Sequence, residues 1–133
     1  MTELDEIALE YRAGRLEAIK VDLERFLLAH RGEIAACRAE QERTTPGITE
    51  ADAVKLFILR HRSIHPAHEI RDQLEEIQKE KWIRGIQSGC APDAQQVAVE
   101  WARAHSAAWR QHRLTTVLYV FDQEQERYLK LLG

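Results

Sequence analysis

Apolar side chains recur every three to four residues along most of this chain, which is the spacing of one face of an α-helix. Thr2, followed three residues later by Asp5, is a capping signal for a helix that runs from there to about Arg43. Gly14 and Gly32 weaken this pattern without ending it, so we expect kinks at both. The apolar face of this first helical leg is Leu16, Ile19, Leu23, Phe26, Leu27, His30, Ile34 and Cys37.

A second leg follows the turn at Pro46-Gly47, because a helix cannot continue through that dipeptide. Thr49 caps its start, with Asp52 as the reciprocal capping residue. Pro66 divides the leg, since the residue before a proline avoids helical backbone angles, and a new helix begins there. The core-facing row of that new helix is predicted to be Ile70, Leu74 and Ile77.

The third leg runs from Asp93 to Leu132, a segment without glycine or proline. One unbroken helix of about 60 Å is one outcome, at a rise of 1.5 Å per residue. A break near Thr115 is the other, because the β-branched and aromatic residues of Thr115–Phe121 favour a strand by propensity. We predict helix over this segment, since a lone strand has no partner in the chain.

Three helical legs of similar length predict an all-α fold, with the legs packed as an antiparallel bundle. The middle leg is broken at His65-Pro66, so the bundle contains four to five helices. The length of 133 residues fits a single domain that spans residues 1–133.

The net charge of −3 argues against general electrostatic binding of nucleic acid or of an anionic membrane. The acidic N-terminus is unlike a signal peptide, and the longest apolar run, near Val117–Phe121, is too short to span a membrane. Cys37 and Cys90 form no metal-binding or redox motif. We therefore expect a cytoplasmic protein with two free thiols.

Histidines are the most distinctive candidate for chemistry. His30, His61, His105 and His112 fall on the apolar faces of their helices, where a histidine is usually a hydrogen-bonded core residue. The alternative is a transition-metal site, the one cofactor that the sequence suggests. Spacings of four and seven residues place side chains on one side of a helix. On that basis the candidate metal ligands are His61, His65, Glu69, His105 and His112.

Arginines form a second candidate site, because no acidic residue lies between Trp101 and Arg113. Arginines interleaved with tryptophans suit an anion or a single-stranded nucleic acid. The alternative is a solvated basic face that pairs with acidic residues of the same chain, among them Asp72 and Glu80. The candidate anion-binding residues are Arg60, Arg62, Arg103, Arg110 and Arg113.

No catalytic motif stands out. The serines lack the context of an activated nucleophile, and the glycines do not form a phosphate-binding loop. The sequence therefore favours a non-enzymatic helical protein that acts through contact with a protein partner or with a second copy of itself. Trp82 and Trp109 lie at the edge of the apolar faces. Exposed tryptophans mark a partner surface, whereas buried ones seal the ends of the bundle.

Overall fold

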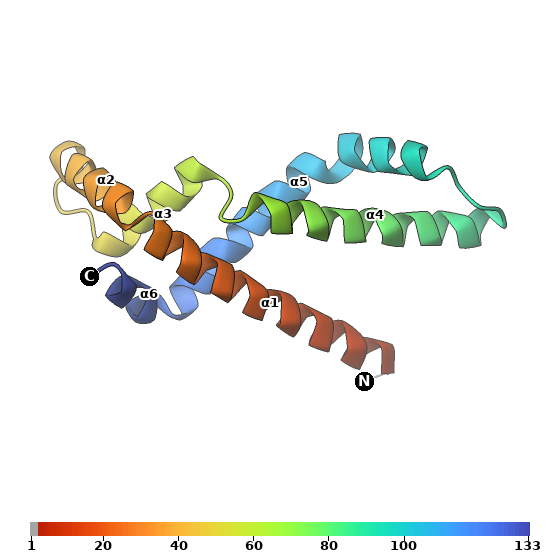
Figure 1. Cartoon of the computed structure of the whole chain (residues 1–133), viewed down its shortest axis with the longest axis horizontal. Helices are drawn as coiled ribbons and strands as arrows, with labels where there is room; N and C mark the ends of the chain where they lie inside the picture. The colour runs from red at the N-terminus through yellow and green to blue at the C-terminus, as the bar shows by residue number, and fades with distance from the viewer. Residues whose placement is uncertain (1–2) are drawn as a thin grey trace. The chain divides into compact units, whose positions relative to one another are not determined.

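The computed structural model describes the backbone of residues 3–133 and the side chains of residues 14–133. This part of the chain contains six helices and no strand (Figure 1). The all-α prediction is confirmed, with more helices than the four or five expected. Thr2, the first predicted cap, lies outside the described residues. The helices are α1 (Glu3–Ala29), α2 (Arg31–Thr44), α3 (Glu50–His61), α4 (Pro66–Ser88), α5 (Ala94–Gln123) and α6 (Gln125–Leu131).

The starts of α3, α4 and α5 and the end of α4 coincide with local sequence signals. The Thr49 hydroxyl accepts the backbone N–H of Asp52 at 3.1 Å and caps α3. Pro66 occupies the first turn of α4, and Gly89 ends that helix with a φ of 70°. The Asp93 carboxylate accepts the N–H groups of the first turn of α5, at 2.9 and 3.1 Å. Capping groups of this kind satisfy backbone donors that the helix itself leaves unpaired.

Two breaks differ from the sequence pattern. The first leg divides at His30, between α1 and α2, rather than at Gly32. In the third leg, α5 continues through Thr115–Phe121 and the chain breaks only at Glu124. Burial explains the helix over the β-branched segment, because Phe121 is fully buried there and packing outweighs intrinsic propensity.

The chain divides into two compact units. The core unit comprises Met1–Ile64 and Thr115–Gly133. Among its described residues, helices α1, α2, α3, α6 and the end of α5 each contribute buried side chains. Its largest fully buried side chains are Leu23, Leu27, Val54, Ile58, Val117, Val120, Phe121 and Tyr128. The packing of three antiparallel legs into one bundle, as a single domain over residues 1–133, stays a prediction.

The hairpin unit comprises His65–Leu114, in which α4 and the first part of α5 run antiparallel (Figure 1). Its two buried apolar side chains are Val97 and Trp101. The prediction that Ile70 and Leu74 form a core row is wrong, because these side chains are 60% and 53% exposed. The helix turns a different side toward α5.

Cys37 and Cys90 are both free thiols, as predicted. Among the described residues, no helix has the length and apolar character that crossing a membrane requires.

Candidate functional site

None of the six histidines is buried in the part of the chain that the structure describes. His61, His105 and His112 are exposed, and the other three are half-buried. The expectation that histidines fill the core is therefore wrong. On α5, the apolar side chains that the helix buries in the hairpin unit are Val97 and Trp101. His105 and His112 remain accessible to solvent.

His30 and His61 belong to an aromatic cluster of the core unit. Their ring centroids lie 4.9 Å apart, and each ring also packs against Phe26. Nδ1 of His61 lies 2.9 Å from the carbonyl oxygen of Ser63, and Nδ1 of His30 lies 3.1 Å from Oε1 of Glu33. Because a carbonyl or a carboxylate oxygen only accepts, both rings donate from Nδ1. These contacts give both histidines a structural role at helix ends.

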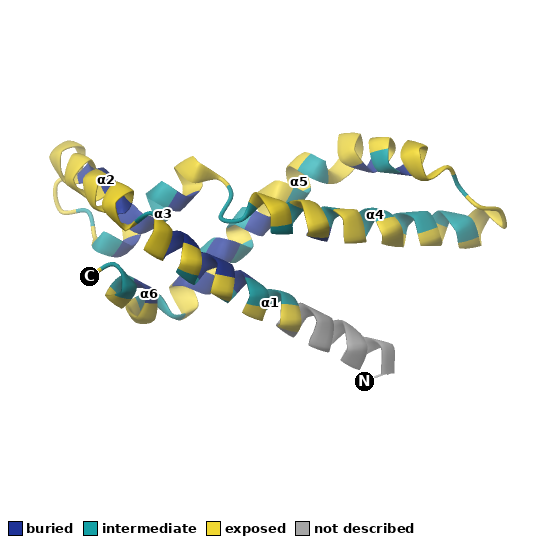
Figure 2. Ribbon diagram, in the orientation of Figure 1, coloured by how far each residue is buried: buried dark blue, intermediate teal, exposed yellow. Residues whose placement is uncertain are grey.

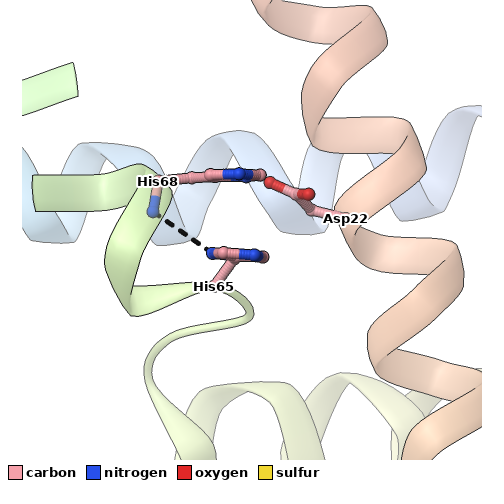
Figure 3. Close-up of side chains that lie close together, drawn as sticks. All are labelled: Asp22, His65 and His68. Carbon is pink, nitrogen blue, oxygen red and sulfur yellow. Dashed lines mark hydrogen bonds between the residues drawn. The ribbon is translucent and has the colours of Figure 1, made fainter. Parts of the chain in front are cut away.

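His65 caps the N-terminus of α4. Its Nδ1 accepts the backbone N–H of His68 at 3.2 Å, and the two rings stack with centroids 3.5 Å apart (Figure 3). A neutral imidazole whose Nδ1 accepts carries its proton on Nε2. Sequence reasoning missed this cap, because histidine is not among the usual N-cap residues. The sequence signal that could have revealed this cap is the position of His65 directly before Pro66, which occupies the first turn of α4.

The predicted metal ligands belong to both units. His61 is part of the core unit, whereas His65, Glu69, His105 and His112 are part of the hairpin unit. Within the hairpin unit, no three of the described His, Cys, Asp or Glu side chains bring ligand atoms within 4.8 Å of one another. The metal hypothesis therefore stays a prediction, without a three-ligand group inside this unit.

The chemistry of His65 also bears on metal binding. A metal ion bound at Nδ1 of His65 would use the lone pair that caps α4. A metal ion bound at Nε2 would require the proton on Nδ1, which also removes that lone pair, so either mode of binding would compete with the cap. Figure 3 also labels Asp22, a buried carboxylate of α1 in the core unit. Asp22, His65 and His68 are residues of the types that bind transition metals.

We predict that His65→Ala lowers the free energy of unfolding by about 1 kcal/mol, because α4 loses its N-cap. His65→Asn is the matched control, since asparagine caps a helix through its own side-chain oxygen and should retain most of the stability. Urea unfolding followed by tryptophan fluorescence measures the difference. All three tryptophans lie in the hairpin unit, so the signal reports that unit. Equal losses for both variants would show that capping is not the role of His65.

The candidate anion-binding arginines likewise belong to both units. In the core unit, Arg60 lies against α2, with its guanidinium 3.9 Å from Sγ of Cys37. The Gln41 side chain, with its oxygen turned toward Arg60, accepts from the same guanidinium at 2.7 and 3.1 Å. Arg62 is exposed and ends α3 with a φ of 70°. Arg60 therefore ties α3 to α2.

On α5, Arg103 and Arg110 are exposed but Arg113 is buried. One terminal nitrogen of Arg113 lies 2.8 Å from Oδ2 of Asp72, which is also buried. Nε of Arg71 lies 3.2 Å from the other oxygen of the same carboxylate. An anion at Arg113 would have to displace Asp72. The hypothesis that the basic face pairs with acids of the same chain is confirmed at this residue, and anion binding at the exposed arginines stays a prediction.

A row of large apolar side chains is exposed on α4. The row consists of Ile70 (60% exposed), Leu74 (53%), Trp82 (68%) and Ile86 (61%). Gln78, which is also exposed, occupies the middle of the row. Side chains four residues apart are neighbours on a helix surface, so each of these five positions adjoins the next, in a row that winds about 40° around α4 at each step. Exposed residues follow α4 along its length (Figure 2). We call the four apolar residues the α4 row.

The opposite side of α4 carries the polar contacts with α5. The Ser106 hydroxyl donates to Oε1 of Gln73 at 3.0 Å, next to the buried pair of Asp72 and Arg113. Nearer the turn, Arg84 pairs with Glu100 on α5, and the hydrogen bond from Arg84 lowers the pKa of that carboxyl group. The hairpin unit therefore buries a charged pair as well as Val97 and Trp101, and it leaves the α4 row on its surface.

No protein-family model, curated protein or solved structure matches this chain. Its function has to be argued from its own residues.

The tryptophans differ in how far they are buried. Trp101 is buried, whereas Trp82 is the most exposed large apolar side chain among the described residues.

A hollow of about 380 Å³ lies beside the α4 row. Four of its lining residues follow one another at the spacing i, i+3, i+4, i+7, which is the set that receives a side chain from a facing helix. Gly85 has no side chain and deepens the hollow. The lining residues are Gln78, Lys81, Trp82, Gly85, Ile86 and Pro92.

Proposed function

We propose that this chain acts by protein–protein contact, with the α4 row as its binding surface. The observation that carries the proposal is the exposure of Ile70, Leu74, Trp82 and Ile86 as one contiguous row. Single exposed apolar residues are ordinary, but a contiguous row that includes a tryptophan is typical of an interaction site. Tryptophan is also among the residues that contribute most to binding energy at interfaces.

The small core of the hairpin unit supports the proposal. Val97 and Trp101 are its two buried apolar side chains, and each contributes on the order of 1.5 to 3 kcal/mol by burial. Ordering a residue costs roughly 1.5 kcal/mol, so a hairpin of two helices needs more apolar burial than this. Covering the α4 row would provide it. Contact with a partner would therefore stabilise the unit as well as bind the partner.

Photo-crosslinking tests the proposal. We expect benzoylphenylalanine at Gln78, in the middle of the α4 row, to give covalent adducts in cells that produce the protein naturally. The matched control is the same group at Gln87, which is exposed on α4 away from the row. Adducts should form from position 78, disappear with Leu74→Glu, and not form from position 87. If position 78 gives no adduct that depends on Leu74, the α4 row is not a binding surface.

A further inference from the structure

We propose that the partner of the α4 row is the α4 row of a second copy of this chain. The two helices run antiparallel, and a two-fold axis passes beside Gln78. The inference rests on the proposed function and specifies the occupant of that surface. Three features of α4 support it: the symmetry of the row, the fit of one side chain to the hollow, and the distribution of charge.

The α4 row is symmetric about its centre. Leu74 and Trp82 each lie four residues from Gln78, and Ile70 and Ile86 each lie eight residues from it. In an antiparallel pair centred on Gln78, Leu74 of one copy meets Trp82 of the other. Ile70 and Ile86 lie eight residues from Gln78, which turns them about 80° around the helix to opposite sides, so they flank the centre of the interface. The two Leu74–Trp82 contacts are equivalent, as a self-complementary two-fold interface requires.

The hollow fits the same register. The centre of the hollow lies at the height of residue 82 along α4, among Gln78, Lys81, Trp82 and Gly85. Leu74 of an antiparallel copy reaches that level, so its side chain would enter the hollow as a knob enters a hole. The missing side chain at Gly85 leaves room for it. At the centre, the two Gln78 amides face each other and can exchange hydrogen bonds, since each has both donors and an acceptor.

The charge along α4 favours the antiparallel orientation. Four acidic residues and one arginine precede Gln78 on this helix, whereas three basic residues and one acidic residue follow it. Antiparallel pairing sets the acidic half of each helix against the basic half of the other, and parallel pairing sets like against like. The acidic residues are Glu69, Asp72, Glu75 and Glu76, and the basic ones beyond Gln78 are Lys79, Lys81 and Arg84. Asp72 and Arg84 pair with Arg113 and Glu100 on α5, so the other five carry the complementarity between copies.

Glu75 and Lys79 make this complementarity specific. Both are exposed and flank the α4 row on the same side, four residues apart. In the proposed register, Glu75 of one copy lies within about 3 Å along the helix axis of the level of Lys79 of the other, at 1.5 Å per residue. Each dimer therefore gains two Glu75–Lys79 contacts between copies.

The size of the row sets the expected strength. Four side chains that are each more than half exposed bury on the order of 400 Å² per copy, or about 800 Å² for the pair, which is below the usual range for stable complexes. We therefore expect a reversible dimer with a dissociation constant on the order of micromolar.

Sedimentation velocity over a concentration series tests the dimer with the full-length chain. The wild type should shift from monomer to dimer as concentration rises, and Leu74→Glu should weaken dimerisation at least 10-fold. Val99→Glu is the matched control, because Val99 is an exposed apolar residue on α5 outside the row. Circular dichroism of each variant checks that it is folded. A folded wild type that stays monomeric at all concentrations overturns the inference.

A charge-reversal mixture tests the register. Glu75→Lys gives each copy lysine at both positions 75 and 79, and Lys79→Glu gives each copy glutamate at both positions. Either variant therefore sets like charges against each other between two identical copies. Each variant alone should dimerise less than the wild type, and an equal mixture of the two should regain dimers as mixed pairs. Contacts within one helix cannot be restored by mixing, so recovery reports contacts between copies. Mixed pairs no more abundant than chance overturn the antiparallel register.

A disulfide tests the position of the two-fold axis. In a Cys90→Ser background, Gln78→Cys should form a disulfide-linked dimer on mild oxidation, because residue 78 meets its own copy there. Gln87→Cys is the control, since the two copies of residue 87 lie about 27 Å apart along the axis at 1.5 Å per residue. That separation is far beyond the reach of a disulfide. Equal crosslinking at both positions would refute the register.

These results separate the inference from the proposed function. A purified chain that remains monomeric, while Gln78 still crosslinks to a protein of a different mass in cells, removes the second copy as partner but retains the contact role. A monomer without any adduct that depends on the row removes both.

Discussion

Arg113→Met should lower the free energy of unfolding of the hairpin unit by about 3 to 5 kcal/mol, the range for a buried ion pair that loses one partner. Arg113 and Asp72 are both buried, and the distance between their closest charged atoms is 2.8 Å. After the substitution, the Asp72 carboxylate retains Arg71 but loses the buried cation. Methionine preserves much of the apolar stem, so the loss reports mainly the uncompensated charge.

The measurement is urea unfolding followed by tryptophan fluorescence. Arg110→Met is the matched control, because Arg110 is an exposed arginine of the same helix, and we expect a change within about 0.5 kcal/mol. Asp72→Leu combined with Arg113→Met should recover much of the loss, since apolar residues can replace a buried pair at little cost. A single Arg113→Met variant as stable as the control would show that the pair contributes nothing to the fold.

The same pair illustrates what the sequence could predict. The absence of acids between Trp101 and Arg113 correctly indicated a basic face, and pairing with acidic residues of α4 was one of its two interpretations. The pattern could not show which arginine is buried. Burial depends on which side of α5 faces α4, and that is set by packing between helices. The guanidinium of Arg113 also lies over the Trp109 ring, at 5.5 Å.

Helix ends were predictable because their causes are local. Pro66, Gly89 and Asp93 each act through the backbone of the next few residues, and each lies at a helix end in the structure. The role of Ile70 and Leu74 was not predictable in this way. Periodicity shows that side chains share a face, but it does not show what covers that face. Within the hairpin unit, α4 packs against α5, and this contact leaves Ile70 and Leu74 exposed.

Tyr128→Phe should raise the free energy of unfolding of the core unit by about 1 to 3 kcal/mol. Tyr128 is fully buried and stacks on Phe121, with ring centroids 5.9 Å apart. Its hydroxyl has no hydrogen-bond partner among the described residues. In the unfolded chain that hydroxyl is hydrogen-bonded to water, so folding carries a desolvation cost that phenylalanine avoids.

The same residue predicts a dependence on alkaline pH. Burial raises the pKa of Tyr128, and nearby carboxylates including Glu124 raise it further, although Arg127 opposes them. The folded state therefore holds the phenolic proton more tightly than the unfolded chain, whose tyrosine pKa is about 10. The contribution of this raised pKa to the free energy of unfolding is fully present below about pH 10. It is lost as the pH rises from there through the pKa of the folded state.

We therefore expect the stability gained by Tyr128→Phe to increase above about pH 10. Above that pH the tyrosine of the unfolded wild type ionises, whereas the buried tyrosine of the folded state resists ionisation, so the wild type loses stability and the phenylalanine variant does not. Far-ultraviolet circular dichroism during urea unfolding, repeated between neutral and alkaline pH, measures this. Tyr119→Phe is the matched control, because Tyr119 is 56% exposed. A pH profile for Tyr128→Phe that parallels the wild type would show that the hydroxyl ionises as readily in the folded protein as in the unfolded chain.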